Sequence, residues 1–344
     1  MKKCFITGAA GFIGSQIAYH LYKKGYEVTL LDNFSYGKED NLIFEDYDFR
    51  QEIIRGDIRD KALINKLFEK KKFDYVYHIA AITPLPDCQT NPAEAVDVNV
   101  TGTVAILEAS RVYGAEKIIF ASTSAVYENN TDFPSVEDNV VPPSLIYPST
   151  KYTAEQFCRA YADTYNMNIV CLRFANVYGP HLDCLRTQPP VTGYMIRELF
   201  FQRNPVLHGD GTQRRDFVYV EDLIRLAELV IQKGTGFDIV NVSTGTTVSV
   251  NELMDTVIRL MNVHDYPPEY REVAHFWHNY PNLYGGAYPI REEALANEVT
   301  KYTELSNAHA FEKYGWKPLT DLETGVQNTI DFSLKILEKS IQDN

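Results

Sequence analysis

The stretch Thr7-Gly8-Ala9-Ala10-Gly11-Phe12-Ile13-Gly14 determines how this 344-residue chain is interpreted. The apolar run 4–6 directly before it predicts a buried first strand, and the apolar positions of 12–22 repeat with the period of an amphipathic helix. A strand, a tight turn and a helix therefore open the chain. This order is typical of the first unit of an α/β fold with a parallel sheet.

Three glycines in this turn are spaced Gly-x-x-Gly-x-x-Gly, and each has a separate role. Gly8 permits a tight exit from the strand, Gly11 lets the backbone approach a ligand, and Gly14 lets the helix pack closely on the sheet. The unpaired N–H groups where the helix starts, at Phe12 and Ile13, and the positive end of the helix dipole favour a pyrophosphate. We therefore expect these residues to bind a dinucleotide, with an ordinary turn between strand and helix as the alternative.

An acidic residue at the end of the second strand supports this interpretation. The apolar run 26–31 predicts that strand, and Asp32 follows it, 24 residues after Gly8. The separation is close to the ~20 residues expected for the carboxylate that binds the ribose hydroxyls of the adenosine. Because a carboxylate would repel a 2′-phosphate, we predict NAD rather than NADP, bound by Asp32 and its neighbour Asn33. A solvent-facing aspartate at a strand end is the alternative.

Composition and charge restrict the classes of partner. Hydrophobic residues make up 45% of the chain and charged residues 23%, which is typical of a globular protein with a large core in two lobes. The net charge of −13 argues against nucleic-acid binding, which needs clustered Lys and Arg. No apolar run approaches the ~20 residues of a membrane span, and no cleavable signal precedes the first strand. We expect a cytoplasmic protein that binds neither nucleic acid nor membrane.

The cysteines give no sign of a disulfide framework or of a metal site. Their number is odd and no pair has C-x-x-C spacing, so we expect reduced thiols and no metal. They are Cys4, Cys88, Cys158, Cys171 and Cys184.

The first half of the chain alternates short β-rich runs with helical patterns. This alternation predicts an α/β fold: a Rossmann-type parallel sheet with helices on both faces, plus a smaller C-terminal substrate-binding lobe. After the first two strands, the expected strands are 53–54, 75–79, 117–122 and 169–174, and the expected helices are 61–68, 91–113 and 147–165.

The alternation weakens after residue 176, where prolines at positions 180, 189, 190 and 205 suggest that the chain leaves the sheet. We expect it to return at 216–220 and 237–242, to leave again through an aromatic-rich segment at 266–302, and to end in a helix at 321–338. These changes predict an NAD-binding domain of 1–175 with 216–245, a nucleotide-sugar-binding lobe of 176–215 with 246–320, and a closing helix in 321–344.

A tyrosine and a lysine stand four residues apart where the helix at 147–165 is expected to start. Residues at i and i+4 share a helix face, so the Tyr147 phenol and the Lys151 ammonium can enter one cleft. That ammonium and an oxidised nicotinamide ring would lower the pKa of Tyr147 and make it a base. Thr123 follows the fifth strand, and parallel sheets bind ligands at that strand end. A surface Tyr and Lys is the usual alternative for a bare Tyr-x-x-x-Lys match.

With these residues the chain resembles the extended short-chain dehydrogenase/reductases that modify nucleotide sugars, a group that includes UDP-glucose 4-epimerase. The resemblance covers nearly the whole chain. Besides the opening turn, Thr123, Tyr147 and Lys151, the matching motifs are Gly56-Asp57-Ile58-Arg59-Asp60, His78-Ile79-Ala80-Ala81, Asn99, Arg173-Phe174-Ala175-Asn176-Val177-Tyr178-Gly179-Pro180, Gly209-Asp210-Gly211-Thr212-Gln213-Arg214-Arg215-Asp216-Phe217 and Val220-Glu221-Asp222.

The resemblance implies further contacts with the cofactor. Asp57 and Ile58 would meet the adenine, and the backbone of Ala80-Ala81 would line the nicotinamide ribose. Lys151 would hold that ribose and tune the catalytic tyrosine. The resemblance also implies that Asn99 belongs to the cofactor site.

The resemblance also implies a substrate site for a nucleotide-diphosphate sugar. Asn176 would touch the sugar diphosphate, and Arg215 would pair with phosphate, because its planar guanidinium matches phosphate oxygens. A structural role for Arg215, paired with Asp216 or Asp222, is the alternative. Two hydroxyl side chains complete the expected substrate set, Thr83 and Ser124.

The implied reaction is oxidation of a sugar hydroxyl, usually at C4: Thr123 hydrogen-bonds the hydroxyl, Tyr147 removes its proton, and the carbon gives hydride to NAD. Dehydratases of this group carry an Asp-Glu pair directly after the threonine, where this chain has Ser124-Ala125. Decarboxylating relatives have a Glu, and 3,5-epimerases a Cys, at the alanine position. A methyl group cannot transfer a proton, so these three chemistries are disfavoured. We expect Cys184 to be a buried inert thiol rather than a group of the cleft.

The favoured function is an NDP-sugar 4-epimerase, in which the 4-keto sugar turns over and takes the hydride back on its other face. The alternative is a 4-dehydrogenase that releases the keto sugar. A non-catalytic NAD-binding regulator is the alternative from another class, and retention of Thr123, Tyr147 and Lys151 counts against it.

One segment departs from the group. Relatives that act on common UDP-hexoses usually have a short Arg-Pro-Gly-Asp stretch, where this chain has a long aromatic-rich segment at 270–298. Its aromatic residues either fill the core of a small lobe or shape a pocket for an unusual sugar or base, and the nucleotide and the sugar stay open. The group commonly forms homodimers through helices near 96–107 and 152–165, and Phe157 and Tyr161 fit such an interface.

Overall fold

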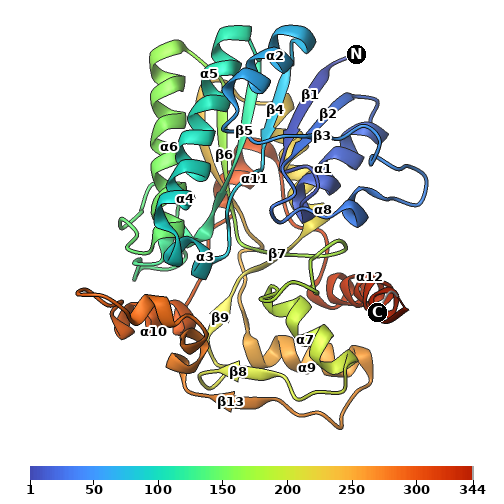
Figure 1. The fold of residues 1–344 in the computed structure, drawn as a ribbon, viewed down its shortest axis with the longest axis vertical. Helices are drawn as coiled ribbons and strands as arrows, with labels where there is room; N and C mark the ends of the chain where they lie inside the picture. Colours follow the sequence, from blue (N-terminus) through green and yellow to red (C-terminus); the bar gives the residue numbers. More distant parts are fainter. Residues whose placement is uncertain (343–344) are drawn as a thin grey trace.

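A parallel sheet forms the centre of the computed structural model, which describes residues 1–342 (Figure 1). Within that range seven strands pair in the order β11-β6-β5-β4-β1-β2-β3, all of them parallel. The predicted Rossmann-type sheet is therefore confirmed. The strands are β1 (Lys3–Thr7), β2 (Glu27–Asp32), β3 (Ile54–Arg55), β4 (Tyr75–His78), β5 (Lys117–Thr123), β6 (Ile169–Phe174) and β11 (Phe237–Val242).

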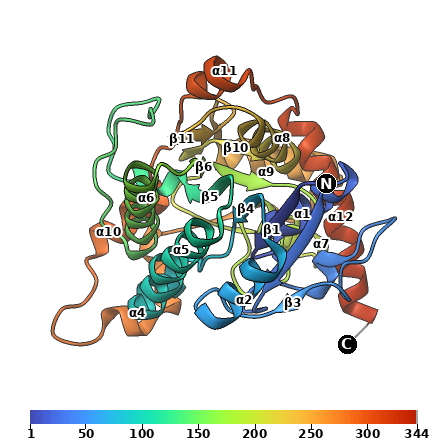
Figure 2. The same ribbon diagram turned by 90° about the horizontal axis from the view of Figure 1, so that it is seen from above.

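Helices cover both faces of this sheet, as Figure 2 shows from above. Successive strand residues point to opposite faces, so Ile6 packs in one apolar core and its neighbour Phe5 in the other. Every residue of β5 and β6 is buried, as expected for strands covered on both sides. One face carries α1 (Phe12–Lys23) and α8 (Val220–Gln232), and the other carries α2 (Lys61–Lys71), α5 (Thr103–Tyr113) and α6 (Ile146–Tyr165).

The helix expected at 91–113 is interrupted. It consists of α4 (Pro92–Val96), a π-helical segment at Asp97–Gly102, and α5. Such segments often occur at functional positions because they turn a side chain away from the regular helical direction. The residue concerned here is Asn99, which the periodicity of the sequence could not show.

The expected return of residues 216–220 to the sheet is wrong. The strand there, β10 (Phe217–Tyr219), pairs only with β7 (Asn176–Tyr178), in a separate two-stranded sheet. The chain enters α8 directly at Val220, which leaves no length for a longer strand. The return at 237–242 is confirmed, because β11 pairs with β6 at the sheet edge.

A smaller lobe has its own apolar core. Its helices are α7 (Val191–Phe200), α9 (Val250–Met261) and α12 (Leu322–Gln342), and its short strands are β8 (Val206–His208), β9 (Arg214–Arg215), β12 (Val248–Ser249) and β13 (Glu269–Arg271). The closing helix α12 packs on α7 and α9, so it belongs with this lobe. In contrast α11 (Ala308–Tyr314) contacts β11 and α8 of the large domain. We keep the predicted domain boundaries as a proposal with two changes: α12 joins the small lobe, and α11 joins the large domain.

The aromatic-rich segment forms a satellite core. It contains two 3-10 turns, Val273–Asn279 and Pro281–Tyr284, followed by α10 (Glu292–Thr300). Trp277 and Leu283 are buried there, packed against other aromatic residues and against Leu85 of α3 (Leu85–Thr90). These aromatic side chains therefore fill a small core. Tyr288 is not part of this core, since it is 97% exposed.

All five cysteines are buried, and none of them is in a disulfide. Among residues 1–342 no helix is long and apolar enough to cross a membrane. The same residues contain no group of three or more His, Cys, Asp or Glu side chains that could hold a metal ion.

Candidate active site

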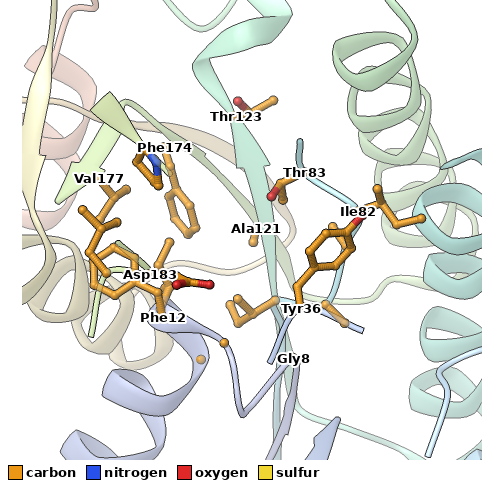
Figure 3. Close-up of a pocket in the computed structure, with 18 of the residues that line it drawn as sticks. Gly8, Phe12, Tyr36, Ile82, Thr83, Ala121, Thr123, Phe174, Val177 and Asp183 are labelled. Carbon is orange, nitrogen blue, oxygen red and sulfur yellow. The ribbon is translucent and has the colours of Figure 1, made fainter. Parts of the chain in front are cut away.

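A cavity of about 840 Å³ lies at the carboxyl ends of the central strands, between the sheet and the small lobe. In Figure 3, Ala121 and Thr123 of β5 separate Ile82 and Thr83 on one side from Phe174 and Val177 on the other. Most residues expected to bind cofactor or substrate line this cavity: Gly8, Gly11, Phe12, Ile13, Gly14, Asp32, Asn33, Ile58, Ala80, Ala81, Thr83, Thr123, Tyr147, Lys151, Asn176 and Arg215. Three expected residues do not, namely Asp57, Asn99 and Ser124.

The glycine turn has the geometry that a phosphate cradle needs. Gly8 has a φ of +68°, and a Cβ there would lie 2.8 Å from the backbone of Ala80. A Cβ on Gly14 would lie 2.1 Å from the Gly8 carbonyl oxygen, so a side chain there would push α1 off the turn. No side chain caps the start of α1, and its first turn has no acidic residue. The N–H groups of Phe12 and Ile13 therefore remain available to an anion at the cavity wall.

Asp32 is held firmly at the end of β2. One carboxylate oxygen accepts the Ala10 N–H at 2.9 Å, and the other accepts the Phe34 N–H at 2.7 Å. Burial raises the pKa of Asp32, and these two hydrogen bonds oppose the rise. Each oxygen keeps a lone pair for a further donor, as binding of ribose hydroxyls would require.

The expectation that Asp57 lines the cofactor site is not met. Its carboxylate is turned onto Arg59, which donates from Nε at 2.9 Å and from Nη2 at 2.8 Å. Arg59 also holds the pKa of Asp57 down, at about 2. The Asn33 side chain donates to the same carboxylate at 2.9 Å, so Asp57 positions a residue of the cavity wall instead. Its neighbour Ile58 does line the cavity.

Asn99 also lies behind the cavity wall, where it positions other residues. Its side chain accepts the Ile82 N–H at 2.8 Å, donates to the Ile82 carbonyl at 2.9 Å, and donates to the Thr150 hydroxyl at 3.0 Å. The π-helical segment thus ties the loop after β4 to α6, next to Lys151. Asn99 thus acts on the cavity wall through its bonds to Ile82, which lines the cavity.

A buried hydrogen-bond chain extends from Asn99 to the glycine turn. The Thr103 hydroxyl donates to the Asn99 carbonyl at 2.7 Å, so it accepts from His78 Nε2 at 3.0 Å. His78 Nδ1 then accepts from the Thr7 hydroxyl at 2.8 Å, and that oxygen accepts the Ala80 N–H at 3.2 Å. Burial lowers the pKa of His78 to about 3, so the imidazole ring stays neutral. The chain fixes β1, β4 and α5 relative to one another.

Thr123, Tyr147 and Lys151 come from different elements and meet at the cavity. The Thr123 oxygen accepts the Ala125 N–H at 3.1 Å, and the hydroxyl is also hydrogen-bonded to the Tyr147 phenol. Burial raises the pKa of Tyr147 to about 12, and the bond with Thr123 opposes this. Burial lowers the pKa of Lys151 to about 8, so its ammonium stays mostly charged at neutral pH. The Nζ atom lies 4.3 Å from the centre of the Phe120 ring.

Ser124, expected to contact substrate, does not line the cavity. Thr123 caps a 3-10 turn that starts at Ser124 and ends at Tyr127, and this turn takes the serine out of the cavity wall. The following Ala125 is buried. No residue of this turn lines the cavity, so the turn adds no polar side chain to the wall next to Thr123.

On the small-lobe side, Asn176 donates to the Asp216 carbonyl at 3.1 Å. Arg215 donates to the Val299 carbonyl at 3.0 Å and to that of Lys301, at the carboxyl end of α10. The carboxylate of Asp216 accepts from Ser243 and Thr244, and that of Asp222 from Arg225. The described partners of Arg215 thus include backbone oxygens, which have no recognisable signal in the sequence.

Several polar residues at the cavity lie in segments without periodicity, so the sequence pattern does not point to them. The Tyr36 hydroxyl donates to Asp87 of α3 at 2.6 Å, and Lys38 pairs with Asp183 at 2.6 Å. Tyr36, Asp183 and Arg186 line the cavity. These contacts join the loop after β2 to α3 and to the segment between β7 and α7.

The family comparison agrees with this geometry. A model described as the NAD dependent epimerase/dehydratase family matches residues 4–243, well over half of the chain. The chain belongs to this family. Its members are NAD-dependent enzymes of the extended short-chain dehydrogenase/reductase type, and the predicted family is therefore confirmed.

Individual family members are similar over almost the full length. A putative UDP-glucose 4-epimerase of Methanocaldococcus jannaschii is 32% identical over 95% of this chain and 97% of its own. A dTDP-D-glucose 4,6-dehydratase of Mus musculus is 30% identical over 97% of this chain and 89% of its own. The crystal structure of a UDP-glucose 4-epimerase from Thermotoga maritima, with UDP-glucose, has a TM-score of 0.85 and 29% identity, covering 97% of this chain and 99% of that one. This chain is therefore similar in sequence to both epimerases and dehydratases.

Proposed function

We propose that this chain is an NDP-sugar 4-epimerase, which oxidises the C4 hydroxyl of a nucleotide sugar and reduces the 4-keto sugar on its opposite face. The observation that carries the proposal is the meeting of Thr123, Tyr147 and Lys151 at one cavity, next to a glycine turn. The family membership supports the same reaction class. A 4-dehydrogenase that releases the keto sugar is the second candidate.

The residues of the glycine turn and of β2 fit NAD. The uncapped start of α1 suits the pyrophosphate, the Asp32 carboxylate suits the ribose hydroxyls, and Asn33 and Ile58 lie on the adenine side. Bound NAD would accept the hydride from C4 and return it. Lys151 and the backbone of Ala80 would hold the nicotinamide end.

Asp32→Asn tests the cofactor assignment. We expect the affinity for NAD to fall about 10- to 100-fold, because hydrogen bonds to a charged group contribute roughly 1.5–3 kcal/mol. The preference for NAD over NADP should narrow, since the charge that repels the 2′-phosphate is gone. Titration calorimetry of nucleotide-free protein with each dinucleotide measures both. Asp40→Asn, a nearby exposed position, is the control, and equal affinities in wild type and Asp32→Asn would contradict the assignment.

Three side chains would perform the proton chemistry. The Thr123 hydroxyl is bonded to Tyr147 and would share a hydrogen bond with the reacting sugar hydroxyl. Tyr147 would take the proton as the base. Its pKa of about 12 must fall for this, and positive charges at Lys151 and on oxidised nicotinamide act in that direction.

Two features favour epimerisation over elimination of water or a thiol-assisted reaction. Ala125 is a buried methyl group, which cannot transfer a proton across C5 and C6. Cys184 is 1% exposed and packs in the core of the small lobe, and burial raises the pKa of its thiol. It is therefore an unreactive thiol away from the cavity.

Two contacts of the loop after β2 favour the epimerase over the dehydrogenase. Tyr36–Asp87 ties this loop to α3, and Lys38–Asp183 ties it to the segment between β7 and α7. Such bridges oppose exchange of a bound cofactor. An epimerase needs no exchange, because each turnover regenerates oxidised NAD, whereas a dehydrogenase must have its NADH reoxidised.

Proton NMR of a panel of UDP-, GDP-, dTDP- and CDP-sugars tests the proposal, with purified protein and no added cofactor. We expect a new anomeric signal from an isomer that keeps its C6 methylene. A product with a C6 methyl group would indicate a 4,6-dehydratase. At most one equivalent of keto sugar per protein, without isomer, would indicate the dehydrogenase and overturn epimerisation of those sugars.

We also propose a homodimer through the outer faces of α4 to α6. Several large apolar side chains are exposed there: Val96, Val112, Phe157 and Tyr165. We expect wild-type protein to elute as a dimer in size-exclusion chromatography with light scattering, and Phe157→Glu to shift it toward monomer. Phe311→Glu, at an exposed position of α11, is the control. A monomeric wild type would contradict the proposal.

A further inference from the structure

Arg186 is a cation at the cavity that the catalytic scheme does not use. It lies between β7 and α7, half-buried, and lines the cavity. Its Nε donates to the Gln188 carbonyl at 2.5 Å. Among the side chains that the structure describes, which leave out those of residues 295 and 298, neither Nη group has a hydrogen-bond or ion-pair partner. The two outer nitrogens of the guanidinium are therefore available to a ligand.

The backbone of Arg186 is fixed on both sides. One oxygen of Asp183 accepts the N–H groups of Leu185 at 3.0 Å and Arg186 at 3.1 Å, and it also pairs with Lys38. Arg197 of α7 donates to the Arg186 carbonyl at 3.1 Å. Together with the Gln188 contact, these bonds limit the positions of the guanidinium before any ligand arrives. A fixed side chain loses less entropy on binding.

The surroundings leave the charge of Arg186 without a direct counter-ion. Burial lowers the pKa of Arg186, while Asp183 and Asp87 act in the opposite direction from a distance. Both carboxylates are bonded to other groups, Asp183 to Lys38 and Asp87 to the Tyr36 hydroxyl. A partly buried guanidinium without a counter-ion is costly, so an anion in the cavity would stabilise it.

The other arginine of the cavity is differently placed. Arg215 donates to the Arg214, Val299 and Lys301 carbonyls, so part of its donor set is used to hold the end of α10. Arg186 has no comparable structural duty at its Nη groups. A guanidinium offers two parallel N–H donors, which match the oxygens of phosphate or carboxylate.

We propose that Arg186 binds an anionic oxygen group of the nucleotide sugar and so helps to set substrate specificity. It would do so from the segment between β7 and α7, whereas Arg215 lies in β9. The group is either the diphosphate or a carboxylate on the sugar ring. The inference rests on the proposed function, because it assumes a nucleotide sugar in this cavity. It adds a binding residue that none of the sequence motifs contains.

Binding measurements on Arg186→Gln and Arg186→Lys test this without turnover. The probes for titration calorimetry are UDP, GDP, dTDP and CDP alone, and UDP-glucose and UDP-glucuronate. We expect Arg186→Gln to weaken binding about 10- to 100-fold. Arg186→Lys should recover only part of the lost affinity, because an ammonium group lacks the two parallel donors of a planar guanidinium. Arg203→Gln, in the same lobe with an exposed side chain, is the control and should bind like wild type.

The probes distinguish the two sources of the anion. Equal weakening for a free diphosphate and its sugar conjugates assigns Arg186 to the diphosphate. Weakening confined to UDP-glucuronate assigns it to a sugar carboxylate. Unchanged affinity for every probe that wild type binds overturns the inference and leaves the proposed function intact. Absence of binding by wild type overturns both.

Thermal melting of the ligand-free variants separates binding from a structural role. Because the guanidinium is tied to the chain only by the Nε bond to the Gln188 carbonyl, we expect the melting temperature of Arg186→Gln to stay close to that of wild type. A lowered melting temperature together with weakened binding would assign Arg186 to the fold and overturn the inference.

Discussion

Tyr147→Phe should lower kcat by about 10²- to 10⁴-fold, the range typical for loss of a positioned general base. The phenol is the group bonded to Thr123 at the cavity, and a phenyl ring retains its shape but cannot take a proton. Substrate affinity should change by no more than about twofold, since proton transfer belongs to the transition state. The NMR assay and titration calorimetry measure the two quantities.

Tyr165→Phe is the control for this substitution. Tyr165 lies at the far end of α6 and is 50% exposed, so its hydroxyl is remote from the cavity. Full activity is expected. The pH profile gives a second readout: the ascending limb of kcat/KM in wild type should reflect loss of the phenol proton and should be absent from Tyr147→Phe. Unchanged turnover in Tyr147→Phe would contradict the role of Tyr147 as the base, and absence of turnover by wild type on every sugar nucleotide would leave an NAD-binding regulator as the alternative.

The second large effect is expected on stability, at a buried ion pair behind the catalytic residues. Arg173 donates to Glu155 from Nε at 2.9 Å and from Nη2 at 2.7 Å, and both side chains are at most 2% exposed. Removing either partner leaves a buried charge alone. Arg173→Met or Glu155→Leu should therefore each lower the free energy of unfolding by about 3–5 kcal/mol.

The double variant should cost less than the sum of the two single variants, because no charge remains buried without a partner. Urea denaturation measures all of them. The exposed pair Arg259–Glu323, which also has two hydrogen bonds between guanidinium and carboxylate, is the control, and its loss should cost no more than about 1 kcal/mol. Equal costs for the buried and exposed pairs would contradict this account.

This ion pair also explains part of the placement of the catalytic groups. Ser122, next to Thr123, donates to Glu155 at 2.5 Å, and Glu155 lies one turn after Lys151 on α6. Arg173 further contacts the Tyr127 hydroxyl at 2.7 Å. The pair thus connects β5, β6 and α6 just beneath the cavity, so its loss should also reduce activity at temperatures where the variant is still folded.

Local sequence determined the parts of the molecule that short-range chemistry controls. The glycine spacing, the apolar runs of the strands and the four-residue separation of Tyr147 and Lys151 predicted the turn, the sheet and one face of α6, and each is present. These features depend on backbone sterics, burial of apolar residues and helical period, which act within a few residues.

Tertiary structure alone decided which polar side chains face the cavity. Asp57 is turned away by Arg59, Asn99 is used by the loop after β4, and a capped 3-10 turn removes Ser124. Arg186 enters from a loop without periodicity. A polar side chain follows the nearest good hydrogen-bond partner, and that partner lies far away in the sequence, so only the assembled fold reveals it.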